Sequence, residues 1–340
     1  MKAPYRRVFK RLSRGAEEVA RAFGVSPRSL YYYLDVFGRD PNEFSHIPSE
    51  VVEAFLLLKC RGISFYTLPP SSIPWPWLMV NVFNLDSLAD LLDDYKERGI
   101  KTYALQVILD AGVDKWWRKP REELPVDYTE DYWEAFWRAV DEAKGLRREF
   151  GFWLEVVAPD YPDDYSSAWG KKHCLWMDSY TNVDRTLENV FHVISQDGKV
   201  RWLLPAQGYE DVPESILRSV EAYVNCGLHR SYRIALANLC VSRRASTIVE
   251  TIRLAREEFE ECKYHVFGPS LTAVKKAISL GYLKGGDSWD TMAWTYPRSK
   301  SFWSAKSSEE RTTYFLLYLK HVVGALHFHM MAEARARELS

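Results

Sequence analysis

Short apolar runs alternate with amphipathic segments along most of the chain, beginning near residue 60. Apolar runs bounded by turn residues predict buried strands, and a 3.6-residue apolar period between them predicts helices. Eight strand–helix repeats over about 240 residues predict an α/β fold, a (β/α)8 TIM-like barrel. An open doubly wound sheet usually has a glycine-rich turn after its first strand, and none is present here. The predicted strands cover residues 63–67, 78–82, 103–109, 152–158, 200–204, 232–237, 265–267 and 286–289.

Start and stop signals define several helices between these strands. Residues 86–99 and 129–151 form two helical units that end at glycine, and a third is expected over 270–281, capped by Ser270. Two more helix starts are predicted by capping boxes that begin at Asp211 and Thr247.

The N-terminal part has a different pattern, and we predict a separate domain over residues 1–58 in front of a barrel over 59–340. Residues 15–38 are predicted to form two short helices with a turn glycine between them, a spacing typical of a helix-turn-helix. The fourteen residues before them include six lysines and arginines and no acidic residue, a composition that favours binding to the phosphate backbone of a nucleic acid. A solvated terminus and a plain helical hairpin are the alternatives. The expected nucleic-acid contacts are Arg6, Arg7, Lys10, Arg11, Arg14, Arg28, Ser29 and Tyr32.

Composition limits the class of protein further. With 47% hydrophobic residues and a net charge of −1, the chain should form a packed globule. No apolar run reaches the roughly 20 residues of a membrane span, and the start of the chain does not resemble a signal peptide. The five cysteines are scattered without a CxxC pair, which indicates reduced thiols and a cytoplasmic protein.

Polar residues stand where four predicted strands end, and functional side chains of barrels lie at such carboxyl ends. These residues are Asp110, Asp160, Gln207 and Asp290. Two carboxylates in one pocket can together break a bond at an anomeric carbon. One attacks or stabilises the carbon, and the other transfers the proton of the leaving group. A third carboxylate and an amide can then read a heterocycle, such as the N1–H and 2-amino edge of guanine. Taken singly, each aspartate also fits a turn or a helix cap.

Five motifs at these strand ends, in this order, resemble the tRNA-guanine transglycosylases and their DNA-modifying relatives, across residues 100–298. The resemblance implies that Asp110 is the general acid/base, and that Asp290, rather than Asp287, is the nucleophile. The motifs are DAG at 110–112, PDYP at 159–162, AQG at 206–208, NLCV at 238–241 and GDSWDT at 286–291. The base-binding residues that the resemblance implies are Asp160, Gln207, Gly208, Asn238 and Leu239.

The chain also departs from the family's pattern. An aromatic residue usually follows the acid/base aspartate by four places and stacks on the purine, but Asp114 stands there. Stacking is therefore expected from Trp116 or Phe267, and Asp114 is a rival for the proton-transfer role. The family's zinc motif of three cysteines and a histidine is missing, because no cysteine follows Cys262. We accordingly expect no zinc and no other metal.

After Tyr296 the chain returns to a helical pattern, which is expected to pack on the outside of the barrel. This segment carries His321, His327 and His329. Without a carboxylate or cysteine at ligand spacing, we expect them to be surface or packing residues rather than metal ligands.

A zinc-free barrel behind a basic helix-turn-helix is most similar to the branch that inserts 7-deazaguanines into DNA. The implied activity is that of a glycosyltransferase, which exchanges guanine in DNA for a free base such as 7-cyano-7-deazaguanine through a covalent glycosyl-aspartate. No cofactor is needed, since one glycosidic bond replaces another. The same exchange on tRNA, a regulator whose barrel senses a purine, and a sugar-active barrel are the alternatives. The oligomeric state stays open, although the tRNA enzymes often form homodimers.

Overall fold

The strands in the described part of the chain form one parallel sheet that closes into a barrel. Neighbouring strands follow the order β1-β8-β7-β6-β5-β4-β3-β2. A parallel bridge between Thr67, directly after β1, and Leu78 of β2 joins the two ends of this sheet. The predicted (β/α)8 TIM-like fold is therefore confirmed. The computed structural model describes residues 48–113, 128–162, 182–209, 211–237, 239–240, 242, 244–295 and 307–339.

Each predicted strand corresponds to one observed strand, with ends displaced by up to three residues. The largest displacement is at the start of β3, because residues 102–104 form a 3-10 turn instead of extended backbone. The strands are β1 (Ser64–Tyr66), β2 (Trp77–Asn81), β3 (Gln106–Asp110), β4 (Trp153–Val157), β5 (Trp202–Ala206), β6 (Arg233–Leu236), β7 (Tyr264–Val266) and β8 (Ser288–Asp290).

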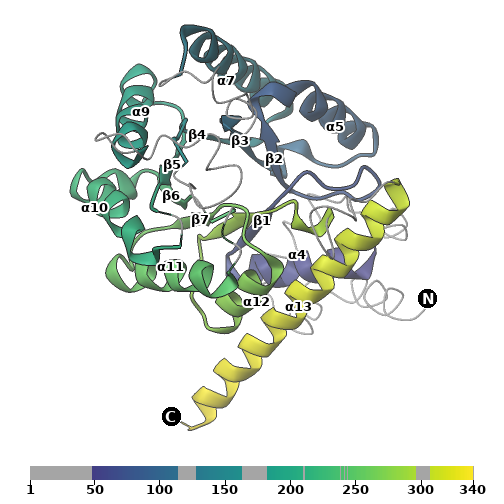
Figure 1. Cartoon of the computed structure of the whole chain (residues 1–340). Helices are drawn as coiled ribbons and strands as arrows, with labels where there is room; N and C mark the ends of the chain where they lie inside the picture. The colour runs from purple at the N-terminus through teal and green to yellow at the C-terminus, as the bar shows by residue number, and fades with distance from the viewer. Residues whose placement is uncertain are drawn as a thin grey trace.

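An α-helix follows every described strand except β1, which leads into β2 without a helix between them, so the predicted strand–helix repeat is incomplete there; the helices surround the barrel, as Figure 1 shows. They are α4 (Ser49–Arg61), α5 (Leu85–Glu97), α7 (Glu130–Phe150), α9 (Asn182–Gln196), α10 (Leu217–Asn225), α11 (Ala245–Glu258), α12 (Leu271–Ser279) and α13 (Ser308–Leu339). Short 3-10 turns are η2 (Val82–Asn84), η3 (Thr102–Ala104), η5 (Pro213–Ile216), η6 (Leu228–Arg230) and η7 (Ala293–Thr295).

Side-chain caps confirm one of the predicted helix starts and contradict two. The Ser270 hydroxyl accepts from the backbone N–H of Ala273, so it caps α12 as expected. The capping box predicted at Thr247 is wrong, because α11 already begins at Ala245 and Thr247 lies inside its first turn. The box predicted at Asp211 is also wrong: this residue has a φ of 58°, and the turn after it has no side-chain cap.

Helix α13 packs on the outside of the barrel against α12 and α4, as the apolar pattern predicts. It crosses the ring of helices in Figure 1, and its C-terminal end extends past it. Phe315 stacks on Phe65 of β1, which in turn stacks on Trp289 of β8. A two-pronged ion pair between Arg61 and Glu333, with N–O distances of 2.6 and 2.9 Å, holds α13 to α4.

The histidines of α13 lie on its surface or pack against neighbouring acids. His321 is exposed, the Nε2 atom of His327 lies 2.9 Å from Glu53, and that of His329 lies 3.1 Å from Glu333. Within the ranges that the structure describes, no group of three or more His, Cys, Asp or Glu side chains could hold a metal ion.

The expected domain boundary between residues 58 and 59 falls inside α4, which continues across it and leads directly into β1. None of the helices described is long and apolar enough to cross a membrane. The basic arm and the helix-turn-helix stay predictions, because they lie outside the described residues together with Arg6, Arg7, Lys10, Arg11, Arg14, Arg28, Ser29 and Tyr32.

Candidate active site at the carboxyl end of the barrel

Four polar residues that the sequence singles out lie at one end of the barrel. Asp110 is the last residue of β3 and Asp290 is the last residue of β8. Asp160 follows β4 by three residues, and Gln207 comes directly after β5. Because all the strands are parallel, their carboxyl ends meet at the same end of the barrel, where enzymes of this fold carry their active sites.

Asp160 and Gln207 are joined by a hydrogen bond. The amide nitrogen of the fully buried Gln207 donates to the Oδ2 atom of Asp160. Burial raises the pKa of Asp160 to about 7, although the hydrogen bond from Gln207 acts in the opposite direction. The Oε1 atom of Gln207 is buried and has no hydrogen-bond partner among the described residues. An acceptor in this position can take an N–H donor from a ligand.

Asp110 is held by a hydrogen bond from the neighbouring strand, and its charge acts on Tyr132, as that of Asp160 does. The side-chain amide of Asn81, at the end of β2, donates to the Oδ2 atom of Asp110 at 3.2 Å. The Tyr132 hydroxyl donates to the carbonyl of Ala111 at 2.9 Å. Burial, followed by the negative charges of Asp110 and Asp160, raises the pKa of Tyr132 well above its usual value. The charges of Asp110 and Asp160 thus both affect the hydroxyl of Tyr132.

Close packing explains the glycine in two of the motifs. Gly112 has a φ of 74°, and a Cβ atom there would lie 2.6 Å from the ring of Phe83. It would also lie 2.9 Å from the side-chain oxygen of Asn81. A Cβ atom on Gly208 would lie 2.7 Å from the Ser215 hydroxyl. Both contacts are too short for any other residue without movement of the neighbours.

The Asp290 carboxylate is bound through one of its two oxygens. Its Oδ1 atom accepts from the backbone N–H of Gly268 at 3.1 Å and lies 3.2 Å from the Nε2 atom of His265. The Oδ2 atom has no partner within the described part of the chain. The side chain is 18% exposed. One carboxylate oxygen is thus oriented by the protein and the other is available to a ligand.

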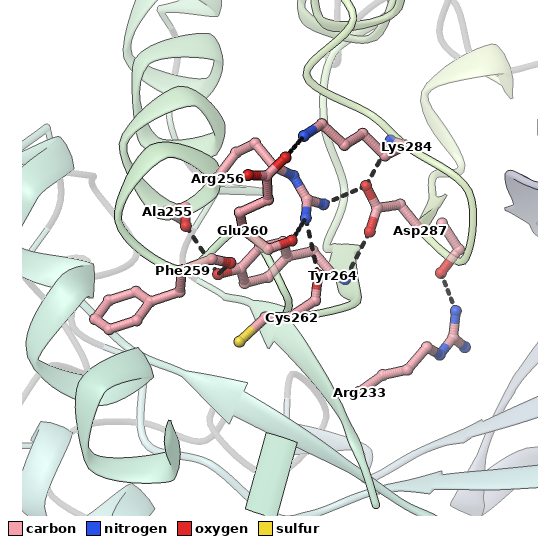
Figure 2. Close-up of polar contacts among 10 residues, drawn as sticks. Arg233, Ala255, Arg256, Phe259, Glu260, Cys262, Tyr264, Lys284 and Asp287 are labelled. Atoms are coloured by element: carbon pink, nitrogen blue, oxygen red, sulfur yellow. Dashed lines mark hydrogen bonds and ion pairs between the residues drawn. The ribbon is translucent and has the colours of Figure 1, made fainter. Parts of the chain in front are cut away.

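Asp287 has a different environment from Asp290, and Figure 2 shows its polar contacts. Its carboxylate pairs with the buried guanidinium of Arg256 at 2.5 Å and accepts from the backbone N–H groups of Tyr264 and Lys284, at 2.8 and 2.7 Å. Its side chain is 1% exposed. It precedes β8, at the amino end of the barrel, so it is a structural residue. Asp290 thus lies at the carboxyl end of the barrel and Asp287 at the amino end, and the choice of Asp290 as the nucleophile stays a prediction.

The remaining expected site residues are placed only in part. Leu239 is 5% exposed, and the Phe267 ring packs with its edge against His265, at 4.9 Å between centroids. The proposed stacking of Phe267 on a base stays a prediction. Asn238, Asp114 and Trp116 lie outside the described residues.

Three residues at this site were not singled out from the sequence. They are Asn81 beside Asp110, and His265 and Ser288, which contact each other at 2.8 Å next to Asp290. A usable signal was present for Asn81 and His265, because each is a polar residue within a predicted strand that is otherwise apolar. A polar side chain buried in a strand requires a partner, and the partner is a candidate for function.

A cavity of about 770 Å³ opens at the opposite, amino-terminal end of the barrel. Its wall includes Trp153, Glu155, Arg201, Arg233 and Lys263. In barrels of this kind the amino end contributes to stability and the carboxyl end to chemistry. Since all four polar strand-end residues lie at the carboxyl end, we place the candidate active site there.

The fold and the site define a class, a (β/α)8 barrel with a polar site at its carboxyl end, but comparison with known proteins assigns no family within it. No family model matches the chain, and neither does any curated protein. Similar solved structures include a uronate isomerase from Bacillus halodurans, with 11% identity, 91% of this chain and 70% of that chain covered, and a TM-score of 0.34. Another is the BexX/CysO complex of Amycolatopsis orientalis, with 14% identity, 83% and 84% coverage, and a TM-score of 0.33. Scores this low carry no argument about function.

Proposed function

We propose that this protein is a guanine transglycosylase of nucleic acid, which exchanges guanine in DNA for a 7-deazaguanine base. The observation that carries the proposal is the set of groups at the carboxyl end of the barrel. It combines a base-reading pair, Asp160 and Gln207, with the carboxylates of Asp110 and Asp290. The order of the motifs along the chain supports the same assignment.

The base is read by hydrogen-bond acceptors. Guanine and 7-deazaguanines both present an N1–H and a 2-amino group, which are donors. The Asp160 carboxylate and the Oε1 atom of Gln207, which has no partner in the described part of the chain, are acceptors of the matching kind. The backbone N–H of Tyr209 donates to the Ser215 hydroxyl at 2.7 Å, and the space at Gly208 is too small for a side chain, so the loop after β5 packs closely against Ser215 beside the glutamine.

The first half of the reaction removes guanine. The Oδ2 atom of Asp290 attacks C1′ of the sugar, the bond from C1′ to N9 breaks, and its electron pair goes to the base. Asp110 supplies a proton to the departing guanine, and a covalent glycosyl-aspartate remains on Asp290.

The second half inserts the new base. The carboxylate of Asp110 takes the N9 proton of the 7-deazaguanine as this nitrogen attacks C1′. The bond between C1′ and the Asp290 oxygen breaks, and its electron pair returns to the carboxylate. Two inversions give net retention at C1′, and no redox or nucleotide cofactor takes part.

A guanine in a duplex must leave the stack before Asp290 can reach its sugar, at a cost of a few kcal/mol. In the proposal, the basic arm of residues 1–14 and the helix-turn-helix hold the phosphates while the base is out of the stack. This part of the proposal rests on the sequence pattern.

An exchange assay tests the proposal. Purified protein is incubated with labelled 7-cyano-7-deazaguanine and duplex DNA, single-stranded DNA or bulk tRNA in parallel. Label in DNA and not in tRNA is the expected result. Label in tRNA alone would support base exchange but show that the substrate is tRNA rather than DNA. Label in none of the three would reject the proposed function.

A further inference from the structure

A row of hydrogen-bonded polar side chains crosses the interior of the barrel and ends at Asp290. Glu155 of β4 accepts from the Nε atom of Arg233 of β6 at 3.1 Å, and the same two side chains share a second, shorter contact. Arg233 donates to the Ser288 hydroxyl, a bond that Figure 2 includes. Ser288 lies 2.8 Å from the Nδ1 atom of His265, and the Nε2 atom of His265 lies 3.2 Å from Asp290.

The direction of each hydrogen bond in this row follows from the donors available. A guanidinium has donors and no acceptor, so the Ser288 oxygen must accept from Arg233. An ionised carboxylate has acceptors only, so the Nε2 atom of His265 must carry the ring proton and donate it to Asp290. A neutral ring that carries its proton on Nε2 has an acceptor at Nδ1, and the hydroxyl proton of Ser288 donates to this atom.

The charge state of His265 agrees with this direction. The ring is fully buried, and burial lowers the pKa of His265, although the carboxylate of Asp290 acts in the opposite direction. The other charged groups that act on it are Arg233, which lowers its pKa, and Glu155, which raises it. The edge contact with the Tyr66 ring adds no charge. A neutral ring has one donor and one acceptor, which is what the two contacts of His265 require.

We propose that His265 is a positioning residue that holds the Oδ1 atom of Asp290 and leaves its Oδ2 atom to attack C1′. This inference rests on the proposed function. Both observed donors to Asp290, Gly268 and His265, are directed to Oδ1, and Oδ2 has no partner among the described residues. This arrangement orients the carboxylate before the substrate binds. The loss of entropy on orienting the nucleophile therefore does not add to the activation free energy of the reaction.

The same hydrogen bond favours the second half of the reaction. While the sugar is attached through Oδ2, the Oδ1 atom is an ester carbonyl and a weaker acceptor. When the bond from C1′ to Oδ2 breaks, the electron pair returns to Asp290 and the carboxylate carries a full charge. A donor binds a carboxylate more strongly than an ester, so His265 stabilises the departing group at this step.

Replacement of His265 tests the proposal through a readout that a purely structural residue would not change. In H265F the donor is lost, and we expect the turnover of base exchange to fall by about 10- to 100-fold, as for a lost hydrogen bond to a charged group. Because release of the sugar is slowed most, the fraction of enzyme that carries the covalent glycosyl adduct during turnover should rise above that of the wild type. H265Q retains a side-chain N–H donor and should recover part of the turnover.

Two controls accompany these variants. His192→Phe makes the same replacement at an exposed position on α9, and its turnover should equal that of the wild type. The affinity for DNA should be unchanged in all variants, because His265 is buried. Wild-type turnover in H265F, or an equal loss of turnover in H265F and H265Q with no rise in adduct, would overturn the proposal.

A second measurement tests the row of hydrogen bonds without any activity. The nitrogen-15 chemical shifts of a histidine ring distinguish its two neutral tautomers and its charged form. The His265 signals are those that disappear from the spectrum of H265Q. The neutral Nε2–H tautomer is expected, and the Nδ1–H tautomer or the charged ring would overturn the inference. If wild-type protein exchanges no base with any polymer, the proposed function fails, and this spectrum still decides whether the row exists.

Discussion

Asp287 and Asp290 are three residues apart and have opposite environments. The Asp287 carboxylate is 1% exposed and pairs with Arg256, whereas Asp290 is 18% exposed and its Oδ2 atom has no partner among the residues that the structure describes. Between them runs β8, which carries the chain from the amino end of the barrel to the carboxyl end. The choice between the two aspartates followed from a family resemblance at the sequence level, and the direction of the strand now supplies a physical reason for it.

Replacement of the nucleophile should abolish exchange. In Asp290→Asn the amide cannot form the glycosyl ester, and we expect a loss of at least about 10³-fold in single-turnover base exchange. No covalent adduct should be visible after denaturation, while the affinity for DNA stays close to that of the wild type. Turnover near the wild-type rate would rule out Asp290 as the nucleophile.

The raised pKa of Asp160 predicts a pH-dependent stability. Its pKa rises from 3.8 to about 7 on folding, because burial disfavours the charged form. The folded state therefore holds this proton more tightly, and the stability gained from it is present below pH 4 and lost as the pH rises through 7. Asp160→Asn has no proton to lose at this position, so its free energy of unfolding should not fall over this pH range for this reason. The difference in free energy of unfolding, variant minus wild type, should therefore increase by at least about 1 kcal/mol between pH 5 and pH 8, as measured by urea unfolding. Parallel pH profiles for the two proteins would contradict the raised pKa.

At the scale of elements, the loop after β3 depends on Gly112. Gly112→Ala adds a Cβ atom that meets the Phe83 ring at 2.6 Å, next to Asp110. We expect a loss of about 1–3 kcal/mol in the free energy of unfolding and a lower exchange rate. Gly99→Ala is the matched control, because its φ of 75° is nearly the same and nothing lies within 4 Å of the added atom. Equal losses in the two variants would mean that backbone strain alone, without the Phe83 contact, accounts for the effect.

Local sequence signals predicted the elements better than their ends. Most of the eight described strands were recognised because a buried parallel strand is a largely continuous apolar run, whereas β8, Ser-Trp-Asp, is short and mostly polar. The helix starts at Asp211 and Thr247 were placed wrongly, since a capping box is a short pattern that tertiary packing overrides. The contact of His265 with Asp290 spans 25 residues, and that of Arg233 with Glu155 spans 78. Such pairs depend on strand order and register, which no local pattern contains.

At the scale of the whole molecule, the two ends of the barrel should respond differently to mutation. Asp287→Asn leaves the Arg256 charge buried without its counter-ion, and we expect a loss of about 3–5 kcal/mol in the free energy of unfolding. Exchange by the protein that remains folded should be close to wild type, because Asp287 lies at the end away from the candidate site. Glu260→Gln breaks the exposed pair with Lys284 and serves as the control, with no measurable change. A loss of exchange in Asp287→Asn without a loss of stability would contradict the structural role.

The closure of the barrel also concerns the order in which the chain is synthesised. β1 is made first among the strands, but its regular parallel neighbour is β8, the last one. Helix α4 likewise packs against α13, which is made after every strand. Until β8 and α13 have emerged from the ribosome, one edge of β1 and the face of α4 that packs against α13 lack their partners. An unpaired strand edge promotes association with other chains, so the nascent protein is prone to aggregation until these two elements have been made.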